Sequence, residues 1–238
     1  MPYHPPTAMK LSEAFPYTFR NLRRQLGLAE PSTQPMVEAC RADDSAFCLE
    51  LQSEYQLTGE QVRRAAERYR LGKSRSGQTL FWMIDEGGTV RDGFISATPR
   101  TWVSQVFRQR CPELARYIRP EHCFVGQHLL GTQPVGIVAS ERSAVLLSEV
   151  MPQMTWLASV YPMNLTVELF SPLQGRVVTL FPATDATMDT WLAWCELADQ
   201  VRRSYDIDIR VSSLLEDRAT AEQKARGIDL AGFIFPRP

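Results

Sequence analysis

Two apolar segments, each followed by a short polar turn and a helix pattern, constrain the fold of this chain most strongly. Residues 135–138 (VGIV) run into the turn 139–142 (ASER) and a helix from Ser143. Residues 176–181 (RVVTLF) run into the turn 182–185 (PATD) and a second helix. Strands that alternate with helices form mainly parallel sheets, and their carboxyl ends meet at one edge. We therefore predict an α/β fold with both turns, here called the first and second elbow, at that edge.

The same alternation continues to the end of the chain. A helix pattern over about 188–204 is followed by an alternating strand at 207–211. A charged helix over 216–226 and an apolar segment at 228–234 follow. We predict that residues 131–238 form one α/β region, with a mainly parallel sheet flanked by helices.

The preceding residues predict a smaller helical region with one β-hairpin. Residues 1–35 read as an extended arm and a short helix, and residues 36–130 as the helical and hairpin region. Thr58 opens a helix, because Gln61 three residues later completes a capping box. In chain order the elements are a helix over 36–55, a helix from Thr58 to Tyr69, hairpin strands at 79–85 and 89–95, and a helix over 100–118.

Composition excludes several classes of protein. The five cysteines are odd in number, widely spaced and free of any C-x-x-C pair, which favours reduced thiols over a disulfide framework. The start of the chain lacks the pattern of a signal peptide, and no segment approaches the ~20 apolar residues of a membrane helix. We expect a cytoplasmic protein with no membrane partner. Its net charge of −1 gives no bulk attraction to nucleic acid.

One local charge pattern does point to nucleic acid. Residues 63–75 contain six basic residues and a single acidic residue, Glu67. We call the basic residues the basic cluster: Arg63, Arg64, Arg68, Arg70, Lys73 and Arg75. Such a cluster can bind phosphates, and we predict it as the nucleic-acid-binding site. The alternative is a solvated helix face. A second basic run comprises Arg100, Arg108, Arg110, Arg116 and Arg119. It strengthens the nucleic-acid prediction only if the fold places both runs on one side of the molecule.

Six short segments carry a resemblance to a known family. They are Tyr69 to Gly72; Phe81 to Asp85 with Val90 to Gly93; Cys123 to Leu130; Ile137 to Ala144; Val177 to Asp185; and Ile228 to Ala231. In this order they resemble a toprim-like domain family of uncharacterised, primase-related proteins from bacterial mobile elements. The resemblance covers about residues 45–238.

The resemblance implies a metal site that this sequence does not preserve. Toprim domains hold Mg²⁺ with a Glu after one strand and an Asp-x-Asp after a later one, and these positions fall at Ala139, Ala183 and Asp185. Glu141 lies two residues beyond the first position. Since Mg²⁺ needs oxygen ligands, we predict no cofactor, and Asp185 and Glu141 are the residual metal ligands if Mg²⁺ binds at all.

The sequence therefore predicts a degenerate, non-catalytic, toprim-like protein related to DNA primases, which binds nucleic acid or a replication partner. One alternative is an Mg-dependent nucleotidyl-transfer or nuclease enzyme whose site is rebuilt from Glu141, Asp185, Asp189 or Asp229. The other is a mobile-element interaction domain that does not bind nucleic acid.

Overall fold

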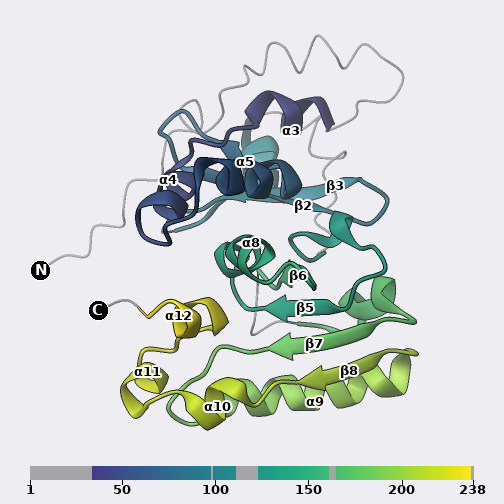
Figure 1. The fold of residues 1–238 in the computed structure, drawn as a ribbon. Helices are drawn as coiled ribbons and strands as arrows, with labels where there is room; N and C mark the ends of the chain where they lie inside the picture. The colour runs from purple at the N-terminus through teal and green to yellow at the C-terminus, as the bar shows by residue number, and fades with distance from the viewer. Residues whose placement is uncertain (1–33, 98, 111–122, 161–164, 237–238) are drawn as a thin grey trace, which may run out of the picture.

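The structure is a computed structural model that describes residues 34–97, 99–110, 123–160 and 165–236. It contains two four-stranded sheets, an antiparallel one formed by the N-terminal region and a parallel one formed by the C-terminal region (Figure 1). The arm and short helix predicted over residues 1–35 lie almost entirely outside these ranges. Within them, every helix is too short or too polar to span a bilayer.

The antiparallel sheet is built around the predicted hairpin, which is confirmed. Trp82 on β2 pairs with Gly93 on β3, where a Cβ atom would lie 2.6 Å from the indole ring, so only glycine fits there. Thr58 and Gln61 form the predicted capping box at the start of α5. The strand order is β1-β2-β3-β4. The elements are α3 (Gln34–Cys40), α4 (Ala46–Ser53), α5 (Gly59–Arg68), β1 (Gly72–Lys73), β2 (Thr79–Ile84), β3 (Val90–Ile95), β4 (Thr101–Trp102) and α6 (Val103–Arg110).

The single helix predicted over 36–55 is wrong, because the chain forms two helices there, α3 and α4. Arg41 leaves the helix after α3 and makes an isolated antiparallel bridge with Gly72 of β1. The Asp-Asp-Ser sequence that follows places Ser45 in an extended conformation before α4. Asp and Ser side chains compete with helical backbone hydrogen bonds, so this sequence favours a break between two helices.

Two other helix predictions need correction. The first residues of the helix predicted over 100–118 form β4, and α6 ends at Arg110, beyond which the described part of the chain is interrupted. The charged helix predicted over 216–226 is two short helices, α10 (Leu214–Arg218) and α11 (Ala221–Ala225). Thr220 separates them because its side chain forms a new capping box with Gln223.

The parallel sheet confirms the predicted C-terminal architecture. Its strand order is β6-β5-β7-β8, and every neighbouring pair is parallel. Val138 lies opposite Phe181 at the last residues of β5 and β7, so both elbows leave the sheet at the same carboxyl edge. The prediction lacks the edge strand β6. The strands are β5 (Val135–Val138), β6 (Thr155–Ala158), β7 (Val177–Phe181) and β8 (Asp208–Val211).

Helices cover the two faces of this sheet through separate cores. On one face Val138 packs in a core with Ala144 of α8, and on the other Ile137 packs in a core with Trp194 of α9. Adjacent residues of a strand point to opposite faces, so the continuously apolar β5 is buried on both sides. The remaining elements are η1 (Gln127–Leu129), α8 (Glu141–Val150), η2 (Val167–Leu173), α9 (Asp189–Ser204) and α12 (Leu230–Ile234).

The core beneath α8 also contains the N-terminal helices and the hairpin, so the two sheets share it. The buried Tyr69 hydroxyl, at the end of α5, lies 2.7 Å from the Trp156 carbonyl and 3.1 Å from the Ala144 carbonyl. Val125 and Ala158 exchange backbone hydrogen bonds of 3.1 and 3.0 Å along the outer side of β6. These contacts hold the N-terminal region against the free edge of β6.

Candidate functional site

The candidate site is the carboxyl edge of the parallel sheet, where the two elbows meet. Ala139 directly follows β5, and Ala183 follows β7 by two residues. Because β5 and β7 are hydrogen-bonded neighbours in register, these two methyl groups occupy adjacent strand ends. They are the positions at which the toprim resemblance implies a Glu and an Asp.

Asp185, the third position of that pattern, acts as a cap for the start of α9. Its Oδ1 accepts hydrogen bonds from the Thr187 N–H (2.8 Å), the Thr187 hydroxyl (2.8 Å) and the Asp189 N–H (3.1 Å). Its Oδ2 accepts from the Thr190 N–H at 2.8 Å. Desolvation opposes ionisation, but the bonds from Thr190 and Thr187 prevail and hold the pKa of Asp185 well below its usual value.

Glu141, the first residue of α8, is neutralised by an arginine from the N-terminal region. Its side chain is only 3% exposed, and its Oε2 accepts from Arg100 Nη2 at 2.8 Å. Arg100 also donates to the Val160 carbonyl at 2.9 Å, and its guanidinium lies 4.8 Å from the centre of the Phe94 ring. Burial raises the pKa of Glu141, while the charge of Arg100 opposes that rise.

The C-terminal segment lies across the elbows and supplies further partners. Asp229 caps α12 by accepting from the Gly232 N–H at 2.9 Å, and it also accepts from the Ser143 hydroxyl of α8. The backbone N–H of Thr184 in the second elbow donates to the Ile228 carbonyl at 2.9 Å. The C-terminal segment therefore contacts α8 just after the first elbow and the backbone of the second elbow.

The acids at this edge do not converge on one point. Glu141 and Asp229 are close enough that Asp229 contributes to the raised pKa of Glu141. Asp185 and Asp189 form a second pair, since the Thr187 hydroxyl lies 2.8 and 2.7 Å from one carboxylate oxygen of each. In the described ranges no group of three His, Cys, Asp or Glu side chains is arranged to hold a metal ion. The strongest positive charge beside Glu141 is Arg100.

The comparisons with known proteins decide the family. The family model described as Domain of unknown function (DUF6371) matches residues 45–184, which is more than half of the 238 residues. The chain belongs to the DUF6371 family. No curated protein matches it.

Among solved structures, this DUF6371 protein is similar to a chain from a bacteriophage T7 assembly. In that assembly, lagging-strand DNA polymerase interacts with primase domains of two gp4 subunits bound to an RNA/DNA hybrid and dTTP. The likeness has a TM-score of 0.43 and a sequence identity of 13%, and it covers 71% of this chain and 86% of that chain.

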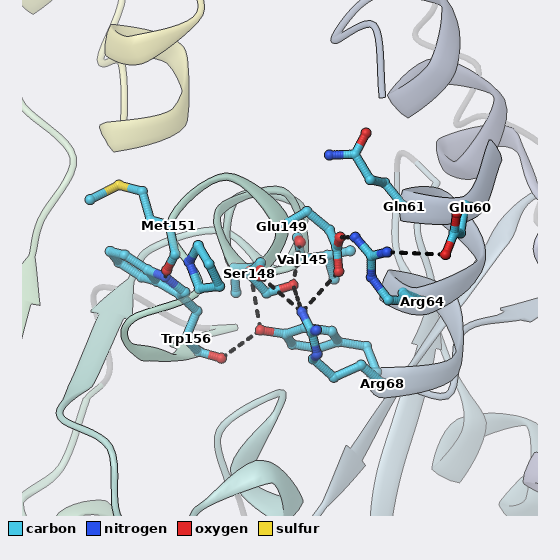
Figure 2. A network of polar contacts seen from close by, with 12 residues as sticks. Glu60, Gln61, Arg64, Arg68, Val145, Ser148, Glu149, Met151 and Trp156 are labelled. Carbon is cyan, nitrogen blue, oxygen red and sulfur yellow. Dashed lines mark hydrogen bonds and ion pairs between the residues drawn. The ribbon is translucent and has the colours of Figure 1, made fainter. Parts of the chain in front are cut away.

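The basic cluster of the DUF6371 protein divides between internal and exposed positions. Figure 2 shows Arg64 and Arg68 reaching from α5 to Glu149 on α8. Their guanidinium nitrogens lie 2.7 and 2.9 Å from the Glu149 carboxylate oxygens. The Glu149 side chain is 1% exposed. Arg68 also donates to the Ser148 carbonyl at 2.9 Å and lies 3.0 Å from the Ser148 hydroxyl. These two arginines therefore join the N-terminal region to the parallel sheet.

The other members of the cluster lie apart from this network. Arg63 is exposed and lines a groove of about 200 Å³ together with Arg41 and Glu67. Lys73 pairs with Asp44, and Arg70 is half-buried with a left-handed backbone (φ 52°). Arg75 is exposed. From the second basic run, the side chains of Arg100 and Arg108 are described, and only Arg100 reaches the elbows.

Proposed function

We propose that this DUF6371 protein is a toprim-like relative of DNA primases that binds nucleic acid without catalysing a reaction on it. The observation that carries the proposal is the pair of methyl groups, Ala139 and Ala183, at adjacent strand ends. In a toprim site these positions supply the carboxylates that hold Mg²⁺. A hard dication binds oxygen ligands, and a methyl group offers none.

The remaining acids also argue against a metal site, because their carboxylates already accept hydrogen bonds or pair with a cation within the chain. Asp185 accepts four hydrogen bonds, two from Thr187 and two from the first N–H groups of α9. Glu141 faces the Arg100 guanidinium at 2.8 Å, and that positive charge repels a dication placed beside the same carboxylate. We infer that Arg100 occupies the electrostatic role that a metal ion has in a catalytic toprim site.

Nucleic-acid binding rests on the exposed part of the basic cluster. Arg63 is exposed in the middle of α5, and Arg75 is exposed two residues after β1. Guanidinium groups on a surface bind backbone phosphates independently of base sequence, with an affinity that falls steeply as salt rises. Arg64 and Arg68 contribute to this surface mainly by fixing α5 on α8. We propose that the protein acts in the cytoplasm, with a replication or mobile-element protein as its partner.

A second candidate, the Mg-dependent nucleotidyl-transfer or nuclease enzyme, is favoured by one observation. Glu141 and Asp229 are neighbouring carboxylates at the sheet edge, and the Ser143 hydroxyl donates to Asp229. Two carboxylates with substrate phosphates are a sufficient Mg²⁺ site in many enzymes. For this pair, Arg100 must first leave Glu141.

Titration of labelled single- and double-stranded DNA tests the proposal, at about 50 and 200 mM salt. We expect sequence-independent binding, and in the Arg63→Ala, Arg75→Ala double variant a salt slope lower by about two units, one for each phosphate contact. The matched control is the Arg203→Ala, Arg226→Ala double variant, which removes the same charge from exposed positions on α9 and after α11. If no DNA binds at the lower salt concentration, the proposal fails and the alternative of an interaction domain that does not bind nucleic acid is favoured.

A further inference from the structure

One face of the parallel sheet is open over β7 and β8. On this face α8 packs over β5 and β6. Next to it, Val177 of β7 is 47% exposed, and the Arg210 side chain of β8 is 72% exposed. Thr179 lies on the same face and pairs with Arg210 in the β7–β8 register. Parallel sheets are usually covered on both faces, so a polar, uncovered half-face needs an explanation.

A groove of about 500 Å³ lies on this open face and continues to the start of α10. Two guanidinium groups and three hydroxyl groups line it, from Arg210, Arg218, Thr179, Ser212 and Ser213. Leu214, which is 38% exposed, gives the groove an apolar wall.

The charges of the groove leave its arginines available to a ligand. Arg210 pairs with Asp208 at 3.1 Å, but both side chains are more than half exposed, and such surface pairs contribute little. Arg218 is exposed, and no carboxylate in the described part of the chain pairs with it. Asp217 also lines the groove, and its carboxylate accepts from the Ser213 hydroxyl at 2.7 Å.

This set of groups matches the chemistry of a phosphate. A guanidinium presents a planar fork of N–H donors that fits two phosphate oxygens, and the hydroxyl groups of Thr179 and Ser212 can donate to the remaining oxygens, whereas that of Ser213 already donates to Asp217. An apolar wall beside such a site can contact the sugar or base that carries the phosphate. We propose that this groove binds a phosphate group of a nucleotide or of a nucleic-acid strand. For the strand, the inference rests on the proposed function.

The experiment measures binding of two probes, ATP and a labelled oligothymidylate, to the full chain. A chelator is present in both titrations. Arg210→Ala with Arg218→Ala removes both guanidinium groups, and Arg203→Ala with Arg226→Ala is the charge-matched control. Because a charge-assisted contact changes an affinity by about tenfold or more, we expect a loss of about a hundredfold for the groove variant. The control should change binding less than about twofold. Thermal melting of both variants verifies that these exposed substitutions leave the fold intact.

The two probes separate the sources of the phosphate. Loss of ATP binding in the groove variant assigns the site to a nucleotide, whereas loss of oligonucleotide binding alone assigns it to a strand. If wild type binds the oligonucleotide and the groove variant keeps all binding of both probes, the groove inference fails and the proposed function stands. If wild type binds ATP through the groove and no oligonucleotide, the groove stands and the proposed function fails. Binding of neither probe overturns both.

Discussion

Arg68→Met is predicted to destabilise the protein by breaking the contact between α5 and α8. One nitrogen of Arg68, Nη1, lies at 2.9, 3.0 and 2.9 Å from the Ser148 carbonyl, the Ser148 hydroxyl and the Glu149 carboxylate. Methionine keeps the apolar stem but removes the charge. The Glu149 carboxylate, 1% exposed, then depends on Arg64 alone.

The magnitude follows from burial and from the remaining partner. Removing one partner of a buried ion pair costs about 3–5 kcal/mol when it leaves an uncompensated charge. Here Arg64 still neutralises Glu149, and the Arg68 side chain is 34% exposed, so solvent screens part of the effect. A hydrogen bond to a charged group contributes about 1.5–3 kcal/mol. We expect a loss of about 2 kcal/mol, or about 4–8 °C in melting temperature for a chain of this size.

Urea and thermal unfolding followed by circular dichroism measure this loss. The matched control is Arg63→Met, an exposed neighbour on the same helix, which should change the free energy of unfolding by less than about 0.5 kcal/mol. The double variant Arg68→Met, Glu149→Leu should regain stability, because replacing both partners removes the buried, under-compensated charge. If Arg68→Met changes the free energy of unfolding no more than Arg63→Met does, the internal role of Arg68 is refuted. Arg68 would then be a candidate phosphate-binding residue again.

Two further predictions concern the core and the sheet edge. Arg100→Met removes the charge that opposes the raised pKa of Glu141, so burial raises that pKa further. Stability conferred by a raised carboxyl pKa is lost as pH rises. The variant should therefore be destabilised by about 2–4 kcal/mol near pH 8 and recover towards pH 5. A loss that does not change with pH would contradict this account. Gly136→Ala places a Cβ atom 2.6 Å from the Trp156 ring and should cost about 1–3 kcal/mol in urea unfolding. Gly59→Ala, where the nearest heavy atom is 3.9 Å away, should be neutral or slightly stabilising.

The parts of the fold that the sequence predicts correctly are those encoded by neighbouring residues. The central strands β5 and β7 are apolar segments followed by elbows, and the capping box of Thr58 and Gln61 fixes the start of α5. The prediction lacks the edge strand β6 (Thr155–Ala158). Its position is fixed by distant groups, including the Tyr69 hydroxyl and the backbone of Val125.

The electrostatic partners at the candidate site are the part that the sequence does not reveal. Arg100 and Glu141 are 41 residues apart, and Arg68 and Glu149 are 81 residues apart. No local pattern links such positions, since their proximity depends on how α8 packs against the N-terminal region. One signal was available: Glu149 lies in the last turn of α8, where the helix dipole disfavours a carboxylate and a cation partner is expected. Arg64 and Arg68 of the basic cluster are therefore internal partners of Glu149, although the sequence pattern alone predicts that they bind phosphate.

The response of the melting temperature to Mn²⁺ tests the central claim, a toprim-like edge without a metal site, most directly. The wild-type protein should melt at nearly the same temperature with and without the ion. The Ala139→Glu, Ala183→Asp double variant brings two new carboxylates towards Asp185, and their mutual repulsion should lower its stability without metal. Mn²⁺ should then restore about 2.7 kcal/mol at about a hundredfold excess over the dissociation constant. A wild-type melting temperature that rises strongly with Mn²⁺ would contradict the account and favour the enzyme.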